Sequence, residues 1–396
     1  MMLVTVSVMA GLTGCGSSSS TADTTNNSGN GSVPANNTAP VTGQAGDGRL
    51  TEIVEYIRKE NGLPALSAVM VHDGQIIEMS ASGLRSINSG VAVTTDDKWH
   101  VGSLAKSMTS TLAALLVKQG TLQWNTTIAE VFPELQGVMR TEYESVRFDE
   151  LLSHTSGLTT NIHNINAYYN RTDDITTQRQ QVIEESLVRA PAVSQGQFNY
   201  SNLGYMIAGA MMERLTGNSW ETLLSNNLFS ALLMTNSGFG APDTLENLTQ
   251  PVGHQMTGNS WRPIRSGNTD NPAILGPAGT VHVTLTDMGN YLAAHLAGAR
   301  GLDVDGLLSA AEFEKLHTPL AIGDYALGWG VVNNSLQHSG SNTMWLATML
   351  INPEKNLALF VATNAADLNN QNSVAFKATN ALIGQLSARA TNAFGQ

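Results

Sequence analysis

The chain is poor in cysteine, in charge and in basic residues. Its 396 residues include one cysteine, Cys15, which excludes an internal disulfide framework and a cysteine-rich zinc site. Charged residues make up 13% of the chain, and 20 Lys and Arg stand against 32 Asp and Glu, for a net charge of −12. Because binding to phosphates needs clustered Lys and Arg, no nucleic-acid partner is expected. The length allows a large core divided between two lobes.

The single cysteine ends an apolar stretch at residues 1–14. As a helix this stretch would cover about 21 Å, less than the roughly 30 Å of a bilayer core, so the core of a signal peptide fits it better. Leu12-Thr13-Gly14-Cys15 resembles the lipobox of bacterial lipoproteins, in which the cysteine is lipidated and becomes the mature N-terminus. A simple secretory signal with an unrelated cysteine is the alternative.

Residues 16–46 consist almost wholly of Ser, Thr, Asn, Gly and Ala. Such a segment buries too little apolar area to offset its chain entropy, so we expect a flexible tether. The predicted organisation is therefore a lipoprotein signal peptide at 1–15, a linker at 16–46 and a folded domain at 47–396. No second long apolar run follows, and no other segment is expected to cross a membrane.

Helical and strand patterns alternate along the folded part. Apolar residues at helical spacing predict helices, and short apolar runs bounded by turn residues predict strands. The predicted helices cover residues 50–61, 104–119, 203–215, 284–296 and 373–386. The predicted strands cover residues 65–71, 75–80, 328–336, 345–351 and 357–363.

The strands stand near both ends of the chain, whereas residues 125–277 are rich in loops with short helices. This order predicts one α/β sheet lobe assembled from both chain ends, with a mainly helical lobe inserted between them. We expect the sheet lobe to cover about 47–102 and 278–396, and the helical lobe about 103–277.

A serine and a lysine stand three residues apart at the start of a predicted helix. Residues i and i+3 share a helix face, so the Ser103 hydroxyl and the Lys106 amine can meet. Burial and the helix N-terminus both favour a neutral lysine, which could accept the proton of Ser103. Ser103 would then be a nucleophile whose own N–H helps to stabilise an oxyanion. A capping serine followed by a solvated lysine is the structural alternative.

Two more motifs follow, Tyr200-Ser201-Asn202 after Gly196-Gln197-Phe198-Asn199, and His338-Ser339-Gly340. With these three motifs in this order, the chain resembles the serine β-lactamase-related hydrolases. That superfamily contains class C β-lactamases, D-stereospecific peptidases and family VIII carboxylesterases. The resemblance covers about residues 50–386 and implies an antiparallel β-lactamase-like sheet flanked by helices, with an inserted mainly helical lobe.

The resemblance also implies catalytic roles. Ser103 would attack an acyl carbonyl and form an acyl-enzyme, while Lys106 and Tyr200 exchange the proton and Tyr200 passes it to the leaving group. Asn202 would hydrogen-bond the lysine amine or a substrate amide. No metal or organic cofactor is expected.

The third motif would bind the substrate. The N–H groups of Ser103 and of Ser341, which follows Gly340, would form the oxyanion hole. Most class C β-lactamases carry a lysine at the position of His338, and a histidine is mostly neutral at pH 7. A neutral ring anchors a carboxylate less strongly, which favours esters or D-amino-acid peptides over β-lactams.

Three further residues lie in or after a Ser/Thr-rich turn. We expect His154 to be structural, with its ring satisfying backbone groups of that turn. Asn161 and His163, in the loop after Gly157, could line the substrate pocket.

The sequence thus predicts a serine hydrolase that cleaves an ester or amide, carboxylesterase-like in the first place. A D-Ala-D-Ala carboxypeptidase, a D-aminopeptidase or a weak β-lactamase is the alternative within the same chemistry. A non-catalytic, envelope-anchored binding module is the alternative of another class. The expected location is the bacterial cell envelope, with the lipid anchor on the periplasmic face of the outer membrane.

Overall fold

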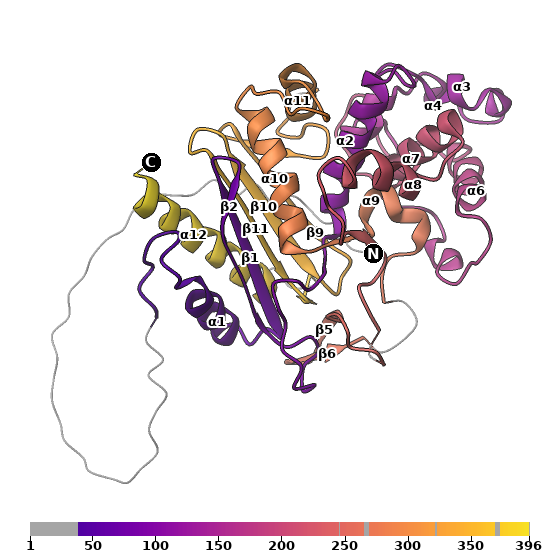
Figure 1. The fold of residues 1–396 in the computed structure, drawn as a ribbon. Coiled ribbons are helices and arrows are strands. Elements are labelled where there is room, and N and C mark those ends of the chain that lie inside the picture. The colour runs from indigo at the N-terminus through magenta and orange to yellow at the C-terminus, as the bar shows by residue number, and fades with distance from the viewer. Residues whose placement is uncertain (1–38, 245, 265–268, 321–322, 369–372, 396) are drawn as a thin grey trace, which may run out of the picture.

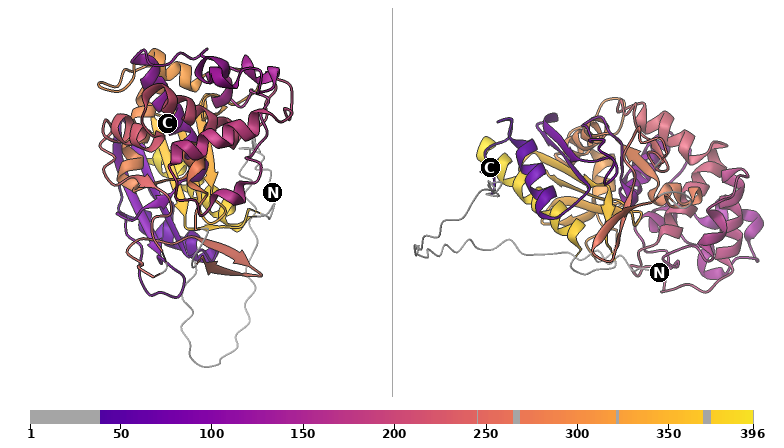
Figure 2. Two further views of the ribbon diagram at one scale, coloured as in Figure 1. Left: turned by 90° about the vertical axis from the view of Figure 1, so that its right-hand side faces the viewer. Right: turned by 90° about the horizontal axis from the view of Figure 1, so that it is seen from below.

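The computed structural model describes residues 39–244, 246–264, 269–320, 323–368 and 373–395. The predicted signal peptide, Cys15 and most of the predicted linker lie outside these ranges. Within them, every helix is too short or too polar to cross a bilayer. Figure 1 shows a sheet with helices on both faces beside a group of helices, and Figure 2 shows that this group lies at the end of the molecule away from the C-terminus.

The main sheet is antiparallel and has six strands in the order β2-β1-β11-β10-β9-β8. One of its inner pairings joins the two ends of the chain, since β1 pairs with β11 in the register Leu66↔Thr363. The prediction of one sheet built from both chain ends is therefore confirmed. The strands are β1 (Ala65–His72), β2 (Gln75–Gly83), β8 (Gly330–Val332), β9 (Ser335–Ser341), β10 (Leu346–Asn352) and β11 (Leu357–Thr363).

Helices cover both faces of this sheet. On one face, α1 (Leu50–Glu60) and α12 (Val374–Phe394) pack against β2 and β11, and on the other α10 (Leu285–Ala299) packs against β1. Successive residues of β1 enter different clusters, with Met70 on the α1 and α12 side and Val71 on the other. A strand buried on both faces reads as a continuous apolar run, which is why β1 shows no alternation.

The inserted lobe surrounds α2 (Ala105–Lys118), which is buried on nearly all sides. A helix that is buried all round belongs to a core, and α2 carries the predicted Ser-x-x-Lys motif into it. The other helices here are α3 (Ile128–Val131), α4 (Thr141–Glu144), α5 (Phe148–Leu152), α6 (Ile175–Leu187), α7 (Asn202–Thr216), α8 (Trp220–Leu224) and α9 (Gly276–Gly279), and α11 (Ala310–His317) packs against α10.

Short elements join the two lobes. One small sheet has the order β12-β5-β6 and the other β3-β7-β4. Their strands are β3 (Trp99–His100), β4 (Gly238–Phe239), β5 (His254–Thr257), β6 (Ser260–Pro263), β7 (Val281–Val283) and β12 (Ala365–Ala366). Single helical turns are η1 (Gly102–Leu104), η2 (Pro133–Leu135), η3 (Ile165–Tyr168), η4 (Ser225–Phe229) and η5 (Ala273–Leu275).

Two boundaries and one helix differ from the sequence prediction. The strand predicted at 328–336 is split by a turn at Asn333 and Asn334, whose positive φ angles of 48° and 61° suit a tight hairpin, and β9 begins after it. The last helix runs to Phe394, beyond residue 386. The 13-residue α6 was not predicted, because its sequence is rich in polar residues and carries few apolar ones.

The folded part also extends further toward the N-terminus than residue 47. The guanidinium of Arg389, on α12, donates to the Thr42 carbonyl at 2.6 Å and to the Asp47 carboxylate at 2.6 Å. Residues 42–46, assigned to the linker from their composition, are thus attached to the C-terminal helix.

Candidate active site

Ser103 lies in η1, where the chain leaves β3 and enters α2, and β9 passes directly beside it. A Cβ atom added to Gly102 would lie 2.3 Å from the backbone N of Ser341. One added to Gly340 would lie 2.6 Å from the backbone N of Ser103. Since real Cβ atoms do not come so close, only glycine at both positions allows this approach. The approach brings together the two backbone N–H groups predicted to form an oxyanion hole.

Lys106 is fully buried and points at the nucleophile. Its Nζ lies 3.0 Å from Oγ of Ser103, and it donates to Oδ1 of Asn202 at 2.7 Å and to the Ala278 carbonyl at 2.8 Å. In the described part of the chain no carboxylate pairs with it, and burial lowers its pKa well below 10.5. In a neutral amine, the two N–H bonds are then taken by Oδ1 of Asn202 and the Ala278 carbonyl oxygen, two atoms that can only accept. The lone pair is left for the Ser103 hydroxyl proton.

Tyr200 completes the immediate surroundings of Ser103. Its hydroxyl interacts electrostatically with the Ser103 side chain, and Nζ of Lys106 lies 4.9 Å from the centre of its ring. Burial raises the pKa of Tyr200 far above 10, so the phenol stays protonated. Burial therefore favours the protonated phenol at Tyr200 and the neutral amine at Lys106.

His338 faces the same space from β9, but it has no charge to offer. Its Nδ1 lies 2.9 Å from the Ser339 carbonyl, so this nitrogen carries the hydrogen, and Nε2 accepts from the Tyr325 hydroxyl at 3.2 Å. Burial, and then the positive charge of Lys106 when protonated, lower the pKa of His338 to about 3. The ring is neutral at any pH near 7.

The geometry agrees with what known proteins indicate. The Beta-lactamase family model matches residues 50–381. The chain belongs to the beta-lactamase family. It is thus a β-lactamase-fold member of a family of serine hydrolases.

Two curated relatives of this beta-lactamase family chain differ in how much they share. Penicillin-binding protein 4 of Amycolatopsis lactamdurans is 29% identical over 284 residues, which cover 70% of this chain and 73% of the relative. Protein flp of Staphylococcus aureus (strain N315) is 21% identical over 331 residues, which cover 80% of this chain. The chain spans only 62% of the length of that staphylococcal protein.

Solved structures show the same fold. The octameric penicillin-binding protein homologue from Pyrococcus abyssi matches with a TM-score of 0.66 at 20% identity, over 85% of this chain and 77% of that one. D-alanine carboxypeptidase AmpC from Burkholderia cenocepacia matches with a TM-score of 0.65 at 20% identity, over 85% of this chain and 98% of that one. The expected β-lactamase-like fold is confirmed.

In this family fold the structure brings together six of the residues singled out from the sequence, namely Ser103, Lys106, Tyr200, Asn202, His338 and Gly340, with the backbone of Ser341 beside them. Cys15 lies outside the described residues. Among the described residues, no three His, Cys, Asp or Glu side chains gather in a way that could hold a metal ion.

His154 is buried behind Tyr200. Its Nδ1 accepts from the backbone N–H of Ser201 at 3.0 Å, and its ring lies 4.2 Å from the ring of Tyr200. Burial lowers its pKa well below 6.5. The ring thus holds the Tyr-x-Asn segment in place. The prediction that it satisfies backbone groups of its own turn is wrong, because among the described residues Nε2 has no hydrogen-bond partner.

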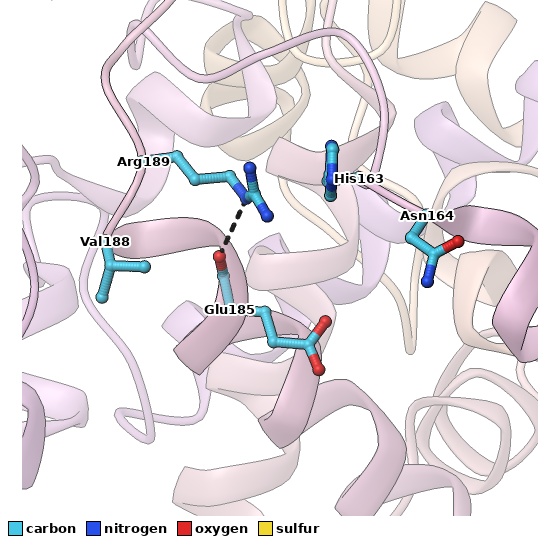
Figure 3. A pocket seen from close by; sticks show the side chains of 5 residues that line it. All are labelled: His163, Asn164, Glu185, Val188 and Arg189. Carbon is cyan, nitrogen blue, oxygen red and sulfur yellow. Dashed lines mark hydrogen bonds between the residues drawn. The ribbon is translucent and has the colours of Figure 1, made fainter.

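The two loop residues after Gly157 lie in different places. Oδ1 of Asn161 accepts from Nδ2 of Asn202 at 2.7 Å, so it orients the amide that in turn contacts Lys106. His163 lines a separate surface pocket beside the end of α6, together with Asn164, Glu185, Val188 and Arg189 (Figure 3).

Tyr325 was missed from the sequence. It packs between His154 and His338, with ring centres 4.8 Å and 5.9 Å away. The available signal was its place two residues before Leu327-Gly328-Trp329-Gly330, the stretch that precedes the His-x-Gly motif. A single tyrosine in a loop carries no periodic pattern, so its contacts depend on the fold.

Proposed function

We propose that the chain hydrolyses an ester or amide through an acyl-enzyme on Ser103. The observation that carries this proposal is Lys106, a buried amine without a carboxylate partner whose Nζ lies 3.0 Å from Oγ of Ser103. A buried lysine that can be neutral near pH 7 is a general base, because it can take the serine proton as the new bond forms.

The chemistry balances over two steps. Oγ of Ser103 bonds to the substrate carbonyl carbon while its proton moves to Nζ of Lys106. The tetrahedral intermediate expels the leaving oxygen or nitrogen, which receives a proton from Tyr200, and Lys106 returns its extra proton to Tyr200. Water then cleaves the acyl-serine, releasing the acid and restoring the Ser103 hydroxyl. The N–H groups of Ser103 and Ser341 would stabilise the oxyanion in each step.

A neutral ester is the first candidate substrate. His338 is neutral, and its Nε2 is occupied by Tyr325. A substrate carboxylate at this place would meet a neutral ring and a neutral amine, and burying an unpaired carboxylate is unfavourable. We therefore put carboxylesterase-like activity first.

A D-alanyl peptide is the second candidate, supported by the names of two relatives. One is a D-alanine carboxypeptidase and the other a penicillin-binding protein. The same chemistry would allow weak β-lactam hydrolysis. A binding module without turnover is the candidate of another class.

A substrate panel tests the proposal. Purified protein should turn over p-nitrophenyl acetate faster than a D-Ala-D-Ala peptide or nitrocefin, and a fluorophosphonate should add to Ser103 as seen by mass spectrometry. Ser103→Ala should abolish both results. Ser110→Ala changes a buried serine of α2 that contacts Tyr205; it is the matched control and should keep them. No adduct and no turnover would favour the binding module, and faster peptide cleavage would favour the D-peptidase.

For the cellular location, we propose a lipid anchor on Cys15 followed by a tether, which would hold the hydrolase in the bacterial cell envelope, on the periplasmic face of the outer membrane. The lipobox-like residues at 12–15 support this. In a bacterial host, labelled palmitate should be incorporated into the full chain, and Cys15→Ala should abolish incorporation and release the protein from the membrane fraction. Unchanged fractionation of Cys15→Ala would contradict the anchor.

A further inference from the structure

A carboxylate outside the predicted motifs lies behind the nucleophile. Asp270 stands between β6 and η5, and 9% of its side chain is exposed. Its Oδ1 lies 2.8 Å from Nε2 of His100, a fully buried ring. The same oxygen accepts from Nδ2 of Asn342 at 2.8 Å and from the backbone N–H of Asn271 at 2.6 Å. One oxygen atom thus meets groups from three segments of the chain.

Two of these segments adjoin Ser103 and Ser341, the residues whose N–H groups are proposed to bind the oxyanion. On the first, Nδ1 of His100 accepts from the backbone N–H of Gly102 at 3.1 Å, and Gly102 immediately precedes Ser103. On the second, Asn342 immediately follows Ser341, and its Oδ1 accepts from the backbone N–H of Met344 at 3.2 Å. Since Nδ1 of His100 accepts, its hydrogen is on Nε2, which lies within 2.8 Å of Asp270 but without the alignment of a hydrogen bond.

The segment of His100 and the segment of Asn342 come very close to each other at Gly102 and Ser341. Gly102 has a positive φ of 52°, and a Cβ there would lie 2.3 Å from the backbone N of Ser341. An oxyanion hole works only if both N–H groups point at the place where negative charge develops, within a few tenths of an ångström. Two glycine-containing segments, one in η1 and one on β9, do not fix such a geometry by themselves.

We infer that Asp270 is a positioning residue which, through His100 and Asn342, aligns the N–H groups of Ser103 and Ser341 as an oxyanion hole. This inference rests on the proposed hydrolase function. The carboxylate of Asp270 contacts His100, Asn342 and the Asn271 N–H, and so acts on Ser103 and Ser341 only through the residues near them.

Comparing the turnover of an oxygen ester with that of its thionoester distinguishes a misaligned oxyanion hole from a general loss of protein stability. N–H groups stabilise an oxyanion far better than the corresponding sulfur anion, so an aligned hole gives a high ratio of the two kcat/KM values. Asp270→Ala should lower kcat/KM for p-nitrophenyl acetate by about 10- to 100-fold and lower the oxygen-to-sulfur ratio with it. Asp270→Asn retains an oxygen acceptor and should restore most of the ratio.

His282 provides a matched control. It is a buried histidine on β7, directly opposite His100 in the strand register, and it contacts the Gly240 carbonyl instead of the nucleophile segment. His282→Ala should reduce the melting temperature without changing the ratio, whereas His100→Ala should change it.

Asn342→Ala removes only the contact of Asp270 with the segment after Ser341. It serves as a second test if Asp270→Ala does not fold. A folded Asp270→Ala or Asn342→Ala with the wild-type ratio would overturn the inference while leaving the hydrolase proposal intact. A wild-type protein that turns over neither ester would overturn the hydrolase proposal, and this inference with it.

Discussion

Lys106 and Arg389 are both completely buried cationic side chains, but their surroundings are opposite. Arg389, on α12, lies 2.6 Å from the carboxylate of Asp47 and 2.8 Å from that of Glu78. The amine of Lys106, on α2, hydrogen-bonds neutral groups among the described residues: the Ser103 hydroxyl, the Asn202 amide and the Ala278 carbonyl.

The pKa shifts of Arg389 and Lys106 reflect these different surroundings. Hydrogen bonds to Glu78, and next to Asp47, raise the pKa of Arg389 further above its usual range, whereas burial alone lowers that of Lys106. A paired buried cation joins two carboxylates to α12 and serves the fold. An unpaired one is unfavourable for the fold as long as it is charged, so burial favours its neutral form, which can accept a proton. Arg389 thus stabilises the fold, whereas Lys106 is suited to the proton transfer proposed above.

The largest expected effect is on catalysis. Lys106→Arg keeps the positive charge but removes the ability to become neutral, so kcat for p-nitrophenyl acetate should fall by about 10²- to 10⁴-fold. Lys118→Arg, at the solvent-exposed end of the same helix, is the control and should leave kcat unchanged. Near-normal turnover by Lys106→Arg would mean that Tyr200 serves as the base.

The next effect is on stability. Arg389→Met leaves Asp47 and Glu78 without their cation, and the free energy of unfolding should fall by about 3–5 kcal/mol, as measured by urea denaturation. Turnover per folded molecule should not change. Arg214→Met removes an exposed ion pair with Glu134 and should cost about 1 kcal/mol or less. Equal losses in both variants would remove the distinction between a buried pair and a surface pair.

A smaller effect concerns one partner of Arg389. Asp47→Asn should lower the free energy of unfolding by about 1.5 kcal/mol at pH 7, since one charged hydrogen bond is lost. The hydrogen bond from Arg389 holds the pKa of Asp47 well below its ordinary 3.8. A depressed folded-state pKa stabilises the fold above the unfolded value, so this contribution is lost as pH falls below about 3.8. Urea titrations of the two proteins should therefore converge in acid, and a constant gap would contradict the assignment.

The smallest expected effect, counted per pH unit, is a dependence of the free energy of unfolding on pH. Lys106 has its ordinary pKa of about 10.4 in the unfolded chain and a much lower one in the folded chain, so between these values the unfolded state binds more protons. The free energy of unfolding should rise with pH in that window by at most about 1.4 kcal/mol per unit. Lys106→Met should remove this rise between about pH 7.5 and 9.5, where ordinary His and Tyr side chains do not titrate. Parallel stability curves for the two proteins would show that Lys106 stays charged when folded.

Much of this architecture was predictable from local patterns. The hairpin around Asp73 and Gly74, the helix of the Ser-x-x-Lys motif and the three C-terminal strand regions each carry a periodic or turn signal, and the motif order indicated the family. The split at Asn333 and Asn334 and the polar helix α6 were missed, because two asparagines and a run of glutamines interrupt or dilute the apolar pattern.

The types and order of the motif residues along the chain were enough to indicate which serine, lysine, tyrosine and histidine come together, because they specify the family. The chemical states of these side chains follow from the folded structure. Burial lowers the pKa of Lys106, whose amine donates to the Ala278 carbonyl, 172 residues away in sequence. The Tyr325 hydroxyl is hydrogen-bonded to Nε2 of His338, and Asp270 accepts a hydrogen bond from Asn342, 72 residues away in sequence. A pKa or a hydrogen bond depends on atoms in contact, and contacts between distant segments exist only once the chain has folded.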